Sequence, residues 1–203
     1  MKTLDRFRFC LSRQIKFLGS FPSQRTTDRR LKILIEAGYI ERKKILYGIP
    51  YLYFLSRKGK VLIHTLGKPE KIRLEQIPHD IAVCDTVIYF MLKHKIELKD
   101  IVTEKELHKS DGFGLRKHRP DFVIKNQNST TCVEVELTLK AKDRLEKNIQ
   151  DNFLNYNYQK WIVPNTQIKI HRILKESSST FPNIEILELE EVQRYVKNYS
   201  DTE

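Results

Sequence analysis

Two helical patterns and then two strand patterns follow one another within residues 11–55, and this order leaves few folds open. Residues 11–18 have the spacing of a short helix, and residues 24–37 have that of a second helix, which Gly38 ends. The break at residues 19–22 contains glycine and proline, which end one helix and redirect the chain. We therefore expect two helices joined by a tight turn.

The strand patterns cover residues 39–46 and 51–55, and the four residues between them contain the glycine and proline of a hairpin turn. Residues 56–66 have the pattern of a closing helix. Helix, turn, helix and hairpin in this order predict a winged helix-turn-helix domain over residues 1–67.

The net charge of +11 is concentrated at one end of the chain. Residues 1–76 contain 18 Lys and Arg against 6 Asp and Glu, a net charge of +12, whereas residues 77–203 contain 19 against 20, a net charge of −1. This asymmetry favours a polyanion as partner, because binding to phosphates releases condensed counterions. We expect double-stranded DNA. The predicted DNA-contacting residues, on the second helix and the hairpin, are Arg25, Arg29, Arg30, Lys32, Arg42, Lys43 and Lys44.

After a connector at residues 67–77, helical and strand patterns alternate over a second predicted domain, residues 78–200. The predicted helices are 79–94, 141–156, about 166–176 and one at the C-terminus, and the predicted strands are 97–107, 121–125, 130–139, 161–163 and 184–189. This order predicts an α/β (α+β) fold with a mixed sheet.

Carboxylates gather near the middle of this second domain. Asp121 begins one predicted strand, and on the next strand Glu134 and Glu136 project to the same side because side chains alternate. Such carboxylates repel one another unless a cation binds between them, and hard oxygen ligands suit Mg²⁺ or Mn²⁺. The candidate metal ligands are thus Asp121, Glu134 and Glu136, and Lys140 completes the candidate catalytic set. His118 is interpreted as a surface loop histidine.

An alternation of valine and glutamate also fits an antiparallel strand with one face in water. Spacing alone leaves both interpretations open.

The location of the chain is constrained by what the sequence lacks. No apolar run approaches the ~20 residues that cross a bilayer, and the N-terminus is too charged for a secretory signal. The cysteines, Cys10, Cys84 and Cys132, are odd in number and far apart, which favours a reducing compartment. We expect a cytoplasmic protein without a membrane partner.

Several runs of the sequence resemble a known family. LSRQI…RRLKILIEAGYIERK…YFLSRKGKVLI resembles the winged-helix segment of the bacterial replication-relaxation family and its mobile-element relatives. HDIAVCDTVIYFML resembles the helix that follows this segment. HRPDFVI…VEVELTLKAKDRLEKNI resembles their C-terminal domain, which is similar to PD-(D/E)xK nucleases and their restriction-endonuclease-like core. The resemblance covers about residues 8 to 190.

The resemblance implies a DNA-binding protein of a mobile element that acts in plasmid mobilisation or replication, as a relaxase-like, metal-dependent endonuclease or nickase. Asp121 would match the motif aspartate and Glu134 the motif acid, whereas Glu136 stands where the motif lysine is usual. One alternative is a binding-only transcriptional regulator or relaxosome accessory protein with an inactive nuclease-like domain. Another is a junction-resolving or repair nuclease, which would prefer branched DNA over a linear duplex. A homodimer or relaxosome proteins are the protein partners that these readings imply.

Overall fold

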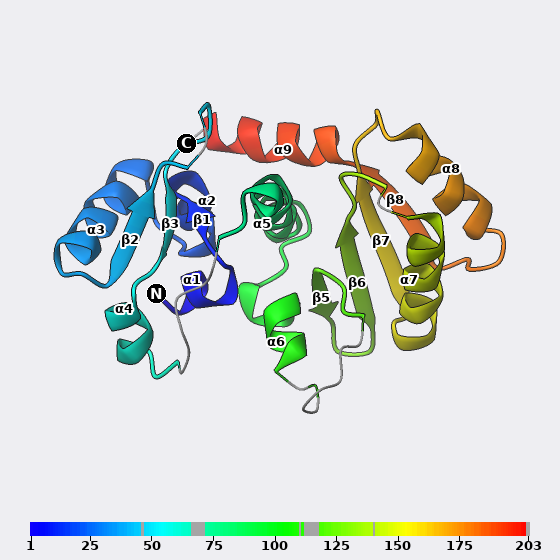
Figure 1. Ribbon diagram of the computed structural model, residues 1–203, viewed down its shortest axis with the longest axis horizontal. Helices are drawn as coiled ribbons and strands as arrows, with labels where there is room; N and C mark the ends of the chain where they lie inside the picture. The colour runs from blue at the N-terminus through cyan, green and yellow to red at the C-terminus, as the bar shows by residue number, and fades with distance from the viewer. Residues whose placement is uncertain (46, 66–71, 110, 112–117, 140, 202–203) are drawn as a thin grey trace. The chain divides into compact units, whose positions relative to one another are not determined.

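The computed structural model describes residues 1–45, 47–65, 72–109, 111, 118–139 and 141–201. It contains two compact units (Figure 1). The N-terminal unit comprises Met1–Ile88 with Asn198–Glu203, and the C-terminal unit comprises Tyr89–Lys197. The domains expected at 1–67 and 78–200 remain a prediction, because contacts define a compact unit without showing that it folds alone.

The N-terminal unit combines short helices with a small antiparallel sheet. Its elements are α1 (Lys2–Arg6), β1 (Cys10–Leu11), α2 (Ser12–Leu18), α3 (Gln24–Glu36), β2 (Ile40–Lys43), β3 (Leu52–Leu55), α4 (Arg57–Leu62), a 3-10 helix (Leu74–Gln76) and the start of α5 (Ile77–Lys93). The strand order is β1-β3-β2, so the hairpin of β2 and β3 gains a third strand. The predicted helices and hairpin are present, but β1 was not predicted because two residues show no periodicity.

The turn between α2 and α3 is fixed by close contacts and a cap. A side chain at Gly19 would place its Cβ 2.6 Å from the ring of Phe21, so only glycine fits there without a shift. The Ser23 hydroxyl accepts a hydrogen bond from the backbone N–H of Thr26 at 3.2 Å and caps α3. At the other end, Gly38 has φ +74°, a conformation that glycine adopts readily after a helix. Both ends of α3 are thus set by local sequence.

The apolar core of the N-terminal unit lies against its sheet. Phe9 and Leu11 from the first strand region pack with Leu52 and Phe54 of β3 and with Ile77 at the start of α5. All five are buried, and the burial of each such side chain stabilises the folded state by about 1.5–3 kcal/mol. The hairpin is therefore held firmly at its base.

A buried polar cluster joins α2 to α5. Arg13 contacts the Asp85 carboxylate through two N–O pairs of 2.7 and 2.8 Å. Gln14 is fully buried, donates to Asp85 at 2.8 Å and accepts from the backbone N–H of Leu11 at 2.9 Å. Because Asp85 is only 3% exposed, its carboxylate depends on the bonds from Arg13 and Gln14 in place of water.

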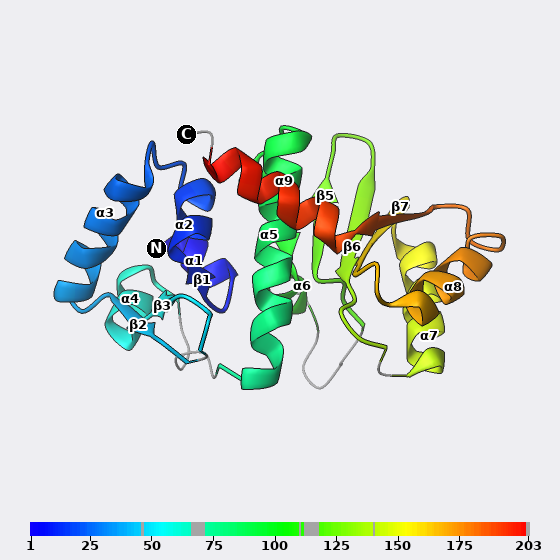
Figure 2. The same ribbon diagram turned by 90° about the horizontal axis from the view of Figure 1, so that it is seen from above.

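The C-terminal unit is built on a mixed sheet. Its elements are the end of α5, β4 (Ile101–Thr103), α6 (Glu104–His108), β5 (Phe122–Lys125), β6 (Thr130–Val135), α7 (Lys142–Asn155), β7 (Tyr158–Val163), α8 (Ile168–Ser177), β8 (Ile184–Glu188) and most of α9 (Leu189–Asp201). The five strands have the order β4-β5-β6-β7-β8. The pairs from β4 to β6 are antiparallel and those from β6 to β8 are parallel. Helices α7 and α8 lie on the same face of this sheet (Figures 1 and 2). The α/β class with a mixed sheet is as predicted.

Two strand predictions in the C-terminal unit extended several residues too far, as did the prediction at residues 39–46, where β2 ends at Lys43. The predicted strand 97–107 is β4 followed at once by α6, because Thr103 and Glu106 form a capping box. The Glu106 carboxylate accepts from the Thr103 backbone N–H at 2.9 Å and from its hydroxyl at 3.0 Å. Glu104 is therefore the first residue of α6, and its backbone N–H donates to the carbonyl of Asp121 at 2.8 Å. The predicted strand 130–139 ends at Val135.

Candidate functional site

The predicted cations of α3 lie on its exposed face. Arg25, Arg29 and Arg30 are exposed, and within the described part of the chain none of their side chains forms an ion pair or hydrogen bond. Lys32 is also exposed and its Nζ lies 3.8 Å from a carboxylate oxygen of Glu36, one helical turn away. The opposite side of the helix is anchored by buried threonine and leucine side chains. The helix thus presents three uncompensated guanidinium groups to solvent.

The acid within this helix is already engaged. Asp28 accepts from the hydroxyl of Ser12 and from the side-chain amide of Gln24 at 2.9 Å. These bonds hold its carboxylate toward the N-terminal end of α2. The Asp28 carboxylate is therefore occupied by Ser12 and Gln24 and forms no ion pair with the neighbouring arginines in the described structure.

The β2–β3 hairpin carries the other predicted cations. Arg42, Lys43 and Lys44 are all exposed. The guanidinium of Arg42 lies 4.7 Å from the centre of the Tyr51 ring, and the Lys43 ammonium lies 5.7 Å from a second aromatic ring, on β3. Helix α3 contacts β2, so both cationic elements belong to one unit. All seven predicted DNA-contacting side chains therefore reach solvent.

In the C-terminal unit, Glu134 lies on β6 beside Trp161 of β7 and is 8% exposed. The interpretation of this part of the strand as a solvated face is therefore wrong. Helix α7 covers this side of the sheet, and its Asn152 donates to the Glu134 carboxylate at 2.9 Å. Burial of a carboxylate is costly unless other groups satisfy it, which makes this position a candidate site.

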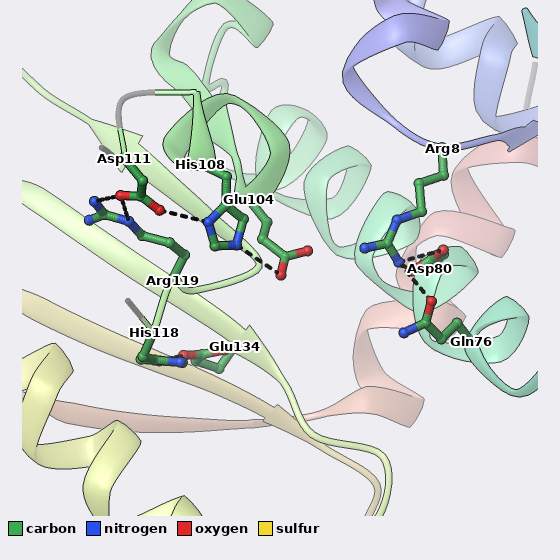
Figure 3. A network of polar contacts seen from close by, with 9 residues as sticks. All are labelled: Arg8, Gln76, Asp80, Glu104, His108, Asp111, His118, Arg119 and Glu134. Carbon is green, nitrogen blue, oxygen red and sulfur yellow. Dashed lines mark hydrogen bonds and ion pairs between the residues drawn. The ribbon is translucent and has the colours of Figure 1, made fainter. Parts of the chain in front are cut away.

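His118 satisfies the same carboxylate. Its Nε2 lies 2.8 Å from Oε1 of Glu134, and Figure 3 shows the two side chains facing one another. The interpretation of His118 as a surface histidine is wrong, because its side chain is only 18% exposed. Burial and the charge of Asp121 raise the pKa of Glu134, while His118 and Asn152 oppose that shift. Burial alone would lower the pKa of His118, but its bond to Glu134 and the charge of Glu134 raise it above the ordinary value.

Asp121 lies next to this pair. Its Oδ2 accepts from the backbone N–H of Val135 at 2.7 Å, which fixes the carboxylate at the end of β6. Asp121 and Glu134 are thus brought together as predicted. Glu136 follows the end of β6 and is half-buried, with its backbone N–H bonded to the carbonyl of Ile162 at 3.0 Å. Lys140 lies outside the described residues.

The donor types at this site suit a hard cation, but the described arrangement does not form a cage for one. Among the residues that the structure describes, no group of three His, Cys, Asp or Glu side chains is placed to hold a metal ion. Oε1 of Glu134 already accepts from His118 and Asn152. The buried Oδ1 of Asn152 has no hydrogen-bond partner among these residues, so one oxygen acceptor remains beside the carboxylate.

A second polar network lies near this site in the C-terminal unit (Figure 3). Arg119 forms an ion pair with Asp111, which also lies 2.8 Å from Nδ1 of His108. Nε2 of His108 lies 3.6 Å from Glu104 on the first turn of α6. Arg119 and His108 lower the pKa of Asp111. This network ties Arg119, the neighbour of His118, to α6 and so helps to position the histidine.

Sequence reasoning missed Asn152, although a signal for it exists. Leu145, Ile149 and Asn152 are the buried residues of α7 and follow one another at spacings of four and three. An asparagine on an apolar helical stripe predicts a buried polar partner, which here is Glu134.

The chain was compared with protein-family models, with curated proteins and with solved structures, and none of them matches it. No helix in the described ranges combines the length and the apolar character that a membrane crossing needs.

Proposed function

We propose that this protein binds double-stranded DNA through α3 and the β2–β3 hairpin. The observation that carries the proposal is the exposed face of α3, where Arg25, Arg29 and Arg30 have no acidic partner in the described structure. Guanidinium groups bind phosphates and the major-groove edge of guanine in a fixed, two-pronged geometry. Cations without an internal partner are available for such contacts.

The order of the elements supports the same proposal. Helix α3 follows a tight turn after α2 and precedes an antiparallel hairpin, which is the order of a winged helix-turn-helix domain. In that arrangement the second helix enters the major groove, whose width of about 12 Å admits one helix. The exposed cations on the hairpin then lie along the flanking backbone.

The biological setting of the proposal rests on the family resemblance alone. We propose a role in plasmid mobilisation or replication, with a homodimer or relaxosome proteins as partners. A binding-only transcriptional regulator or relaxosome accessory protein is the alternative, and the same DNA-binding surface serves both.

The test compares two pairs of substitutions by equilibrium binding to a DNA duplex. Arg25→Ala with Arg29→Ala removes two unpaired cations from α3, whereas Lys169→Ala with Lys175→Ala removes two exposed cations from α8. We expect the first pair to weaken binding and to lower the salt-dependence slope by about 0.9 for each lost phosphate contact, and the second pair to change neither. Equal binding by both variants would contradict the assignment of α3.

A second candidate function is DNA nicking by a nuclease-like C-terminal unit. It is favoured by the buried Glu134 with the half-buried Asp121 beside it, and by the raised pKa of Glu134, a combination common at catalytic sites. Mg²⁺ or Mn²⁺ would supply the charge that stabilises the phosphate under attack. It ranks second because the described side chains do not form a metal cage.

This second function predicts conversion of a supercoiled plasmid to open circles with Mg²⁺ or Mn²⁺. Glu134→Gln should abolish the conversion, whereas Glu146→Gln, an exposed carboxylate on α7, should not. Intact supercoils with the wild-type protein, together with retained DNA binding, would leave the binding-only alternative.

A further inference from the structure

The loop that joins β2 and β3 displays an aromatic side chain at its tip. Tyr47 is 102% exposed, the greatest exposure of any large apolar side chain in the described residues. On either side of it, Ile45 and Ile49 pack against the apolar core of the N-terminal unit. Gly48, with φ +78°, supplies the left-handed residue of the turn. Tyr47 is therefore needed neither for the core nor for the turn.

The same hairpin carries further exposed aromatic and cationic side chains. Tyr51 is 42% exposed, and the guanidinium of Arg42 lies 4.7 Å from its ring centre. Lys44 is exposed one residue beyond the end of β2. Aromatic faces beside positive charge are the chemistry that binds a nucleobase together with its phosphate.

We propose that the hairpin tip, defined as Arg42, Lys44, Tyr47 and Tyr51, binds a base that is unstacked from a duplex. Such bases occur at gaps and at junctions between single-stranded and double-stranded DNA. A ring needs an open base face, and within an intact duplex these faces are covered by neighbouring pairs. The inference rests on the proposed DNA binding and extends it, since it makes interrupted duplexes the favoured substrate.

The experiment uses the full chain and two DNA probes that differ at one place. One probe is a continuous duplex and the other carries a central gap of a few nucleotides, with identical ends. The gap contains 2-aminopurine, whose fluorescence is quenched when an aromatic ring stacks on it. Tyr47→Ala is compared with Tyr47→Phe, which keeps the ring, and with Arg29→Ala, which alters α3 instead.

The wild type should prefer the gapped probe by about fivefold or more, the lower end of what one stacked base contributes. Tyr47→Ala should lose this preference and the quenching while its affinity for the continuous duplex stays within about twofold. Tyr47→Phe should keep both signals. Arg29→Ala should weaken binding to both probes and keep the preference.

Two results would overturn the inference while leaving DNA binding intact. One is an equal affinity of the wild type for both probes, and the other is a gap preference that survives Tyr47→Ala. Absence of binding to either probe would instead remove the proposed function on which the inference rests. Because Tyr47 is fully exposed, an unchanged circular dichroism spectrum is expected for its variants, and a changed spectrum would show that Tyr47 has a structural role and overturn the inference.

Discussion

Arginine side chains are unpaired on the outer face of α3 but paired with carboxylates at the surface where α2 meets α5. At the α5 surface, Arg13 is paired with Asp85 and Arg8 lies 3.3 Å from Asp80 (Figure 3). On α3, by contrast, Arg25 and Arg29 have no acidic partner within the described residues. One set of cations satisfies carboxylates of the fold, and the other faces solvent.

This difference separates structural charges from charges available to a partner. A buried carboxylate such as Asp85 needs its cation, because an unpaired charge in the interior is costly. An exposed guanidinium contributes little to stability, so the unpaired arginines of α3 are available for the proposed DNA binding. Substitutions at the two surfaces should consequently affect different properties.

The largest effect on stability is expected for Asp85→Ala. The change leaves Arg13 without its pair and removes one of the two acceptors of the buried Gln14 amide, the other being the carbonyl of Ile81. It should lower the free energy of unfolding by about 3 kcal/mol. Urea denaturation followed by circular dichroism measures it. Glu36→Ala, which removes an exposed carboxylate from α3, is the matched control. A loss under about 1 kcal/mol would contradict the structural role assigned to the pairing of Arg13 with Asp85.

A smaller effect, of about 2 kcal/mol at pH 6, is expected for His118→Ala, which removes a charge-assisted bond to Glu134. The only tryptophan, Trp161, lies in the C-terminal unit, so its fluorescence reports the unfolding of that unit.

The His118 contribution should depend on pH in a defined direction. Because folding raises the pKa of His118, the stabilisation is complete below its ordinary value of 6.5 and is lost as the pH rises through the higher folded value. The difference between wild type and His118→Ala should therefore shrink between pH 6 and pH 9. A difference that grows with pH would contradict the assigned pairing.

Ser23→Ala should cost about 1 kcal/mol, because it removes the N-terminal cap of α3. This substitution sharpens the comparison, since it destabilises α3 without changing its cations. Urea denaturation of the variant gives the loss, and Ser23→Asp, which keeps a capping acceptor, should recover most of it. Equal losses for both substitutions would show that the hydroxyl does not cap the helix.

The smallest effect on stability is expected for Arg29→Ala, within about 0.5 kcal/mol of the wild type. The same variant should nevertheless weaken DNA binding. A thermal scan and a binding isotherm on one preparation test both statements. A large loss of stability with unchanged DNA binding would show that Arg29 serves the fold and not DNA binding, which contradicts the comparison.

Features set by nearby residues could be predicted from the sequence. The helix 24–37, its stop at Gly38 and the following hairpin depend on local periodicity and turn chemistry, and the structure confirms them. The meeting of Asp121 and Glu134 was also predicted, because it follows from strand alternation across one hairpin.

Features that depend on distant residues could not be predicted in this way. The pairing of His118 with Glu134 joins a residue ahead of β5 to a residue on β6, and the burial of Glu134 depends on α7, whose Asn152 bonds to its carboxylate. The capping box at Thr103 is different, since its residues are local and its signal was present in the sequence. The apolar, β-branched residues Ile101 and Val102 directly before it extend the strand pattern across this signal.

The central claim is tested most directly by the salt dependence of wild-type binding to a short DNA duplex. If the exposed cations of α3 and the hairpin contact phosphates, the logarithm of the binding constant should fall linearly with the logarithm of salt concentration. We predict a slope of about −4 between about 50 and 200 mM salt, corresponding to four or more phosphate contacts. A slope near zero, or no binding at the lowest salt concentration, would contradict the assignment of this surface to DNA.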